Sequence, residues 1–172
     1  MNKFNGIQIA LIGVAASLTL GSCALFGGGE PSDFDARDAD FAGYSTWSLA
    51  AKTTGPSEEL EMAHDAKNPA VTRFIFVKDD AKRKSNGQFP VGTIIAKQSR
   101  LADGTLVGVA TAMVKRAKGF SPNAGNWEWF MLEPKTGTII KNPKGEIQRG
   151  KISMCITCHT DAEATDYSFL IK

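Results

Sequence analysis

Hydrophobic and polar residues alternate through the middle of the chain in the period-two pattern typical of β-strands. β-Branched and aromatic residues fill these segments, and turn-forming pairs such as Asn86-Gly87 and Thr136-Gly137 separate them. The pattern predicts strands over residues 71–77, 92–98, 106–114, 127–132 and 138–140. Because the connections are short and hairpin-like, we expect an antiparallel sheet rather than alternating βαβ units.

Two helices are expected on either side of this strand region, one over residues 44–52 and one over residues 152–164. The predicted fold class is therefore α+β, an antiparallel β-sheet with flanking helices and a functional helix at the C-terminal end.

The N-terminal residues look like a bacterial lipoprotein signal. Lys3 is followed by an apolar run over residues 7–20 and then by Leu20-Gly21-Ser22-Cys23. The resemblance implies that residues 1–22 are a signal peptide, with lipidation of Cys23 and a location on the periplasmic face of a bacterial membrane. Cleavage after Ser22-Cys23-Ala24 would instead give a soluble periplasmic protein. An uncleaved anchor is less favoured, because the apolar run is short for a bilayer crossing and contains Gln8.

Residues 23–42 are rich in Gly, Asp and Ala and are expected to form a flexible tether, which leaves one domain over residues 43–172. Removal of residues 1–22 takes away Lys3 and no acidic residue, so the formal net charge falls from +2 to +1. This small charge gives no indication of a nucleic-acid partner.

The most specific motif is Cys155-Ile156-Thr157-Cys158-His159, the attachment signature of a c-type haem. Each thiol bonds one haem vinyl group, and the adjacent histidine becomes an axial ligand of the iron. On a helix the three positions share one face. A redox dithiol and half of a zinc site are the alternatives, but zinc needs four ligands and only His64 and Cys23 remain.

The position of the motif separates classes of cytochrome. Small electron-transfer cytochromes carry it near the N-terminus and use a later methionine as second axial ligand, whereas here no methionine follows His159. The preceding strands do not make the helix bundle of cytochromes c-prime. A β-sheet domain closed by a C-terminal haem helix remains.

With these features the sequence resembles the cytochrome P-460 and cytochrome c-prime-beta family. The matching stretches are residues 89–97, 113–116, 125–129, 155–159 and 166–169. The resemblance implies one haem c, His159 as proximal ligand, and an open iron facing an aromatic-lined distal pocket. It also implies binding of nitric oxide or hydroxylamine, with oxidation of the ligand and electron release to a periplasmic acceptor in some members.

In cytochrome P-460 a lysine at the strand position of Lys97 bonds covalently to a haem meso carbon. Lys97 shares a strand face with Thr93 and Ile95, so its amine reaches the haem if that face looks toward it. The alternative is a solvated strand lysine.

Other residues are candidates for the iron's distal side. Phe74 and Phe76 are expected to cap it, although most such aromatic residues are simply core. Met62, Met113 and Met131 are candidate sixth ligands, but core methionines more often serve packing.

His64 lies in a polar stretch and is expected at the surface or behind a ligand. As an iron ligand it would make the protein a six-coordinate electron carrier, the alternative function. Arg73, Lys115 and Arg116 could pair with haem propionates or be solvated.

Oxidation of hydroxylamine removes protons, so a carboxylate near the iron would help. The stretch just before the haem motif has none, and Glu128 and Glu146 are the candidate sources. Exposed edges of the sheet could also pair into a homodimer.

Overall fold

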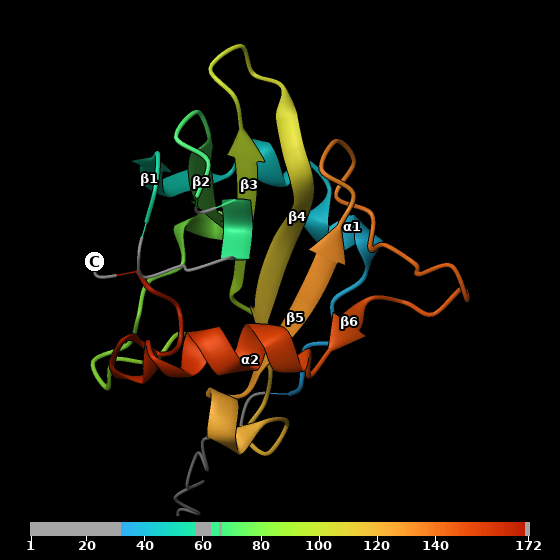
Figure 1. Ribbon diagram of the computed structural model, residues 1–172. Coiled ribbons are helices and arrows are strands. Elements are labelled where there is room, and N and C mark those ends of the chain that lie inside the picture. Colours follow the sequence, from blue (N-terminus) through green and yellow to red (C-terminus); the bar gives the residue numbers. More distant parts are fainter. Residues whose placement is uncertain (1–31, 58–62, 66, 171–172) are drawn as a thin grey trace, which may run out of the picture.

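One antiparallel sheet dominates the computed structural model, which describes residues 32–57, 63–65 and 67–170 (Figure 1). Within these ranges six strands lie side by side in chain order, each antiparallel to the next. Their bounds are β1 Ser48–Thr54, β2 Thr72–Val77, β3 Ile94–Arg100, β4 Leu106–Lys115, β5 Trp127–Leu132 and β6 Arg149–Gly150. The predicted antiparallel sheet is confirmed, and helices contribute little to the described fold.

Four of the predicted strands correspond to β2, β3, β4 and β5, with ends that differ by at most two residues. The fifth, over residues 138–140, is reduced to a single bridge between Leu132 and Ile139. The alternation of apolar residues was therefore a sound guide to the central strands.

The predicted helix over residues 44–52 is wrong. A short 3-10 turn, η1 Tyr44–Thr46, is followed directly by strand β1. Leu49, Ala51 and Lys52 favour helices locally, but intrinsic propensity is a weak preference that tertiary contacts override. Here β1 pairs with β2 from Ser48 opposite Val77 to Thr54 opposite Thr72.

The two faces of the sheet carry separate apolar cores. On one face Phe41 and Tyr44 pack with Phe76, Ile94 and Phe130. The covering elements there are α1 Asp38–Phe41 and η1. The residues on this face form one cluster of buried apolar side chains.

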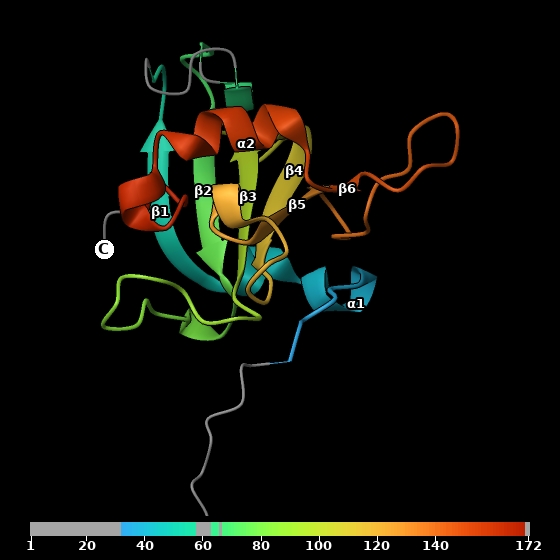
Figure 2. The same cartoon turned by 90° about the horizontal axis from the view of Figure 1, so that it is seen from below.

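The opposite face is covered by α2 Ser153–Thr160, which crosses the strands (Figures 1 and 2). Ile152 and Ile156 pack there against a core that includes Trp127 and Trp129. The predicted C-terminal helix is thus present, although it ends at Thr160 and gives way to the 3-10 turn η6 Glu163–Thr165. None of the helices in the described ranges has the length and apolar character that a membrane crossing requires.

The tether predicted over residues 23–42 is too long, because residues 33–41 pack onto the domain. Phe41 is 0% exposed. The Asp33 carboxylate accepts a hydrogen bond from the Arg116 guanidinium at 2.6 Å, and Asp35 accepts one from Arg149 at 2.6 Å. The folded domain therefore begins near Asp33. The proposed signal peptide and Cys23 lie outside the described residues.

The Asp33 contact predicts an acid-sensitive contribution to stability. Hydrogen bonds from Arg116 and from the Ala117 N–H lower the pKa of Asp33 from 3.8 to about 2. A carboxylate whose pKa is lower in the folded chain stabilises the fold above its unfolded pKa, and this contribution is lost as pH falls toward 2. Asp33→Asn is expected to lower the free energy of unfolding at pH 7 by about 0.2–1 kcal/mol, as for an exposed pair. Thermal unfolding followed by circular dichroism should show the two proteins converging near pH 2, and a constant difference at both pH values would contradict the assignment.

Candidate functional site

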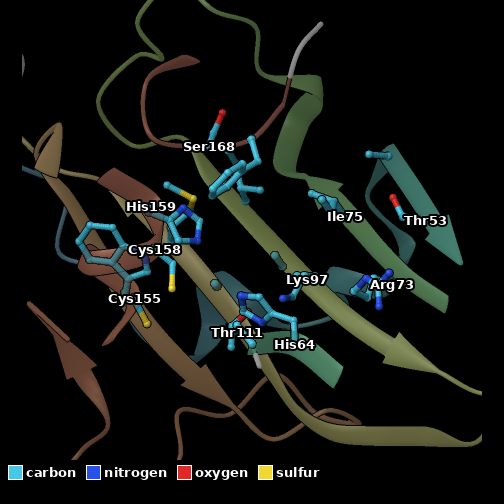
Figure 3. Close-up of a pocket in the computed structure, with 18 of the residues that line it drawn as sticks. Thr53, His64, Arg73, Ile75, Lys97, Thr111, Cys155, Cys158, His159 and Ser168 are labelled. Atoms are coloured by element: carbon cyan, nitrogen blue, oxygen red, sulfur yellow. The ribbon is translucent and has the colours of Figure 1, made fainter. Parts of the chain in front are cut away.

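A pocket lies between α2, the chain that follows it and the strand face beneath (Figure 3). The pocket has a cavity volume of about 230 Å³ and is open to solvent at its mouth. Small side chains on the strands leave this room: Ala51, Thr53, Ala96, Thr111 and Ala112 all line the pocket.

Helix α2 brings Cys155, Cys158 and His159 to the pocket together. Their spacing of three and one places them on one side of the helix, as the motif predicts. Both thiols are free. Burial raises the pKa of the Cys155 thiol to about 11, so this sulfur is protonated at neutral pH.

The imidazole of His159 is held in one tautomer. Its Nδ1 lies 2.6 Å from the carbonyl oxygen of Tyr167. A carbonyl can only accept, so Nδ1 carries the proton and Nε2 keeps its lone pair for a metal. Burial also lowers the pKa of His159, which favours the neutral ring. The rings of Trp129 and Phe169 pack edge-on against it, with centroids at 6.0 and 5.3 Å.

Lys97 points into the same pocket from β3 (Figure 3). Its Nζ is buried and has no hydrogen-bond partner. Burial lowers the pKa of this amine well below its usual value, although the thiol of Cys155 opposes the shift. The strand face that carries Lys97 and Ile95 therefore faces the haem motif, and burial favours the neutral form of the amine.

Of the three proposed propionate partners, only Arg73 lines the pocket. It is 2% exposed, its Nη2 donates to the carbonyl of Gly55, and its Nη1 has no partner. Lys115 instead pairs with Asp166 at 2.6 Å, and Arg116 pairs with Asp33 and Glu128. Arg73 is thus the buried cation that a carboxylate in the pocket would neutralise.

Phe74 and Phe76 do not line the pocket, so the expectation that they cap the iron is corrected. They belong to the opposite face of β2, where Phe76 is core and the two rings stack with centroids 6.3 Å apart. Arg73 and Ile75 occupy the pocket face of this strand. Alternation shows which residues share a face, but it does not show which face carries the site.

His64 lines the pocket, although the sequence placed it at the surface or behind a ligand. It belongs to η3 Ala63–Asp65 and adopts a left-handed backbone conformation, with φ of 61°. Figure 3 shows His64 near Lys97, with the haem motif on one side and Arg73 on the other. Met113 also lines the pocket, Met131 does not, and Met62 lies outside the described residues.

No aspartate or glutamate occurs among the described residues that line the pocket. Glu128 is buried elsewhere, between the guanidinium groups of Arg116 and Arg149. Glu146 is exposed and accepts a hydrogen bond from Asn142 at 2.6 Å. Neither of the predicted carboxylates therefore reaches the site.

Sequence reasoning missed the roles of Trp129, Phe169 and the Tyr167 carbonyl around His159. Residues 166–169 contributed to the family resemblance, which was the available signal. The decisive group is a backbone carbonyl, so no side-chain pattern could identify it.

These features fit a c-type haem. The pocket offers two thiols, a neutral imidazole with a free nitrogen, mostly apolar walls and a buried guanidinium without a full set of partners. In the described part of the chain, no group of three or more His, Cys, Asp or Glu side chains could hold a metal ion directly. The arrangement suits an iron that arrives within a macrocycle better than a bare ion.

Comparison with known proteins agrees with this chemistry. No curated protein sequence matches the chain significantly. A family model described as Cytochrome P460 matches residues 41–170, which covers every strand of the sheet as well as α2. The match implies a haem cofactor and the mono-haem, c-type character of the group. The chain belongs to the cytochrome P460 family.

Proposed function

We propose that this protein is an exported haem c protein whose open iron binds small nitrogen compounds, nitric oxide and hydroxylamine. Cys155 and Cys158 would hold the haem covalently, and His159 would be its proximal ligand. The observation that carries the proposal is the His159 ring, whose Nδ1 is engaged by the Tyr167 carbonyl while Nε2 stays free beside both thiols. Haem bound there would supply an iron that takes up a diatomic ligand and exchanges electrons.

The space beside the motif supports an open iron. Five of the strand residues there are small, and the aromatic residues that line the pocket, Trp129 and Phe169, contact the His159 ring itself. Small residues leave room for an added ligand.

Proton transfer would fall to Lys97 if the protein oxidises hydroxylamine. The described pocket has no carboxylate, but a buried amine with a lowered pKa can accept a proton from a bound ligand. The same neutral amine is what a bond to the haem edge would require. Binding of nitric oxide needs neither role.

His64 supports a second candidate function, six-coordinate electron transfer. It lines the pocket and carries an imidazole that could complete the iron's coordination. A protein with that ligand would exchange electrons without binding gas.

Absorption spectra of the reduced protein, with and without nitric oxide, test the choice. We expect a five-coordinate haem whose spectrum changes when the gas is added. A low-spin haem whose spectrum does not change when nitric oxide is added would overturn the proposal. If His64→Ala then restored gas binding, His64 would be identified as the sixth ligand.

We also propose that the protein is anchored outside the cytoplasm by a lipid on Cys23. There it would pass electrons to a periplasmic acceptor. The Leu20-Gly21-Ser22-Cys23 sequence supports the anchor, and the need to attach haem c outside the inner membrane agrees with export. Loss of the protein from the membrane fraction in Cys23→Ala would support the anchor, and an unchanged distribution would contradict it.

Strand β1 is an edge of the described sheet and largely exposed, which suits pairing with a second copy of the chain.

A further inference from the structure

The chain that follows α2 has an unusual backbone. In this segment, residues 163–170, which we call the proximal tail, three residues other than glycine have positive φ: Asp166 at 54°, Tyr167 at 60° and Phe169 at 51°. Such conformations are uncommon for side chains with a Cβ and persist where surrounding contacts hold them. The contacts that hold the proximal tail in this backbone conformation therefore indicate its role.

Asp166 ties the proximal tail to the sheet. One carboxylate oxygen accepts a hydrogen bond from Lys115 Nζ at 2.6 Å, and the other accepts one from the Phe89 N–H at 2.8 Å. Its own carbonyl accepts one from Trp127 Nε1 at 2.7 Å. The Asp166 side chain is 3% exposed and that of Lys115 is 6% exposed. One residue is thus fixed by three separate elements of the fold.

Arg83 holds the proximal tail on both sides of Tyr167. Its guanidinium donates to the carbonyl of Thr165 and to the hydroxyl of Ser168, both at 2.8 Å, and to the carbonyl of Leu170. The tail therefore cannot shift along its length without breaking several partly buried hydrogen bonds.

These anchors determine where the Tyr167 carbonyl points. The oxygen lies 2.6 Å from His159 Nδ1, and the conformation of the peptide next to it is set by Asp166. A hydrogen-bond acceptor on the outer nitrogen of a ligating histidine orients the ring and makes it a stronger electron donor. A backbone carbonyl has no side chain of its own that could aim it, so the anchors do this.

We propose that Asp166, through its ion pair with Lys115, is a positioning residue for the proximal histidine. It holds the Tyr167 carbonyl against His159 and so tunes the electron donation of the imidazole to the iron. This inference rests on the proposed function, in which His159 ligates the haem. It assigns a positioning role to a buried ion pair whose two residues do not line the pocket.

The test compares Asp166→Asn and Lys115→Met with the wild-type haem protein. Weakening the Nδ1–H hydrogen bond makes the ring a poorer donor, so the iron–histidine stretching frequency should fall in resonance Raman spectra of the reduced protein. The midpoint reduction potential should rise in both variants, because less donation stabilises the oxidised iron less. Asn keeps the shape of Asp166, and Met keeps the length of Lys115, so two independent variants test one arrangement.

Glu128→Gln is the matched control. Glu128 is also a buried carboxylate with cationic partners, but its partners Arg116 and Arg149 do not touch the proximal tail. This variant removes the same charge as Asp166→Asn and is expected to leave the stretching frequency unchanged.

The outcomes separate the two proposals. A wild-type frequency that persists in Asp166→Asn and Lys115→Met, or shifts equally in Glu128→Gln, would overturn the positioning role alone. Absence of an iron–histidine mode in the wild-type protein would overturn the open-iron proposal. The midpoint potentials, which require no open site, would then still decide whether Asp166 acts on His159.

Discussion

The double substitution Cys155→Ala, Cys158→Ala is expected to abolish covalent attachment of haem through cysteine. The two thiols line one pocket with His159, and each can form one thioether, so no attachment through cysteine remains when both are gone. In a Lys97→Met background, which removes the amine expected to bond the haem edge, staining of a denaturing gel for haem should show no signal at the mass of the protein. The single variants should retain haem through one thioether, and their pyridine haemochrome spectra should shift toward that of a haem with one free vinyl group.

Thr157→Ala is the matched control on the same helix. Thr157 lies between the two cysteines but is exposed, and its hydroxyl donates to the carbonyl of Ser153. It should keep a full complement of covalent haem. Haem that stayed on the denatured double variant in the Lys97→Met background would contradict attachment through the cysteines and point to another residue of the pocket.

The haem motif was predictable because its geometry is local. Three positions within five residues lie on one side of any helix, so Cys155, Cys158 and His159 meet whatever the rest of the chain does. The central strands were predictable for a similar reason, since alternation is a property of adjacent residues.

The face of each strand was not predictable in the same way. Phe74 and Phe76 alternate as well as Arg73 and Ile75 do, and the pocket side is decided by α2, which lies about eighty residues later in the chain. The sequence of β2 alone does not indicate which of its faces α2 covers. An aromatic pair therefore looked like a cap for the iron but belongs to the opposite core.

The edges of the domain also depend on distant partners. Residues 33–41 have the composition of a tether, yet Asp33 and Asp35 find their partners in Arg116 and Arg149. Strand β1 similarly has a helix-forming sequence that pairing with β2 overrides. His64 and Arg73 reach the pocket for reasons of loop geometry and strand face that local patterns do not encode.

Lys97→Met is expected to change the haem absorption spectrum strongly. The amine is buried in the pocket of the haem motif, has no hydrogen-bond partner, and has a pKa well below its usual value because of burial. The lowered pKa favours the neutral, nucleophilic amine. The family resemblance implies that it bonds the haem edge, a step in which an N–H and the meso C–H hydrogen are lost and a two-electron oxidant is required. Methionine has a similar length but lacks that nitrogen. The Soret band of the reduced variant should therefore move away from its wild-type position.

Peptide mapping shows whether the amine is bonded or only adjacent. Trypsin cannot cut after a modified lysine, so the wild-type digest should contain residues 85–100 joined through haem to residues 152–172. In Lys97→Met the same two peptides should be separate, with haem on the second. Lys115 is an internal control, because it is also buried but pairs with Asp166 and should be cut normally. A free wild-type peptide that ends at Lys97, together with an unchanged Soret band in the variant, would show that burial of this amine serves the pocket without any bond to the haem.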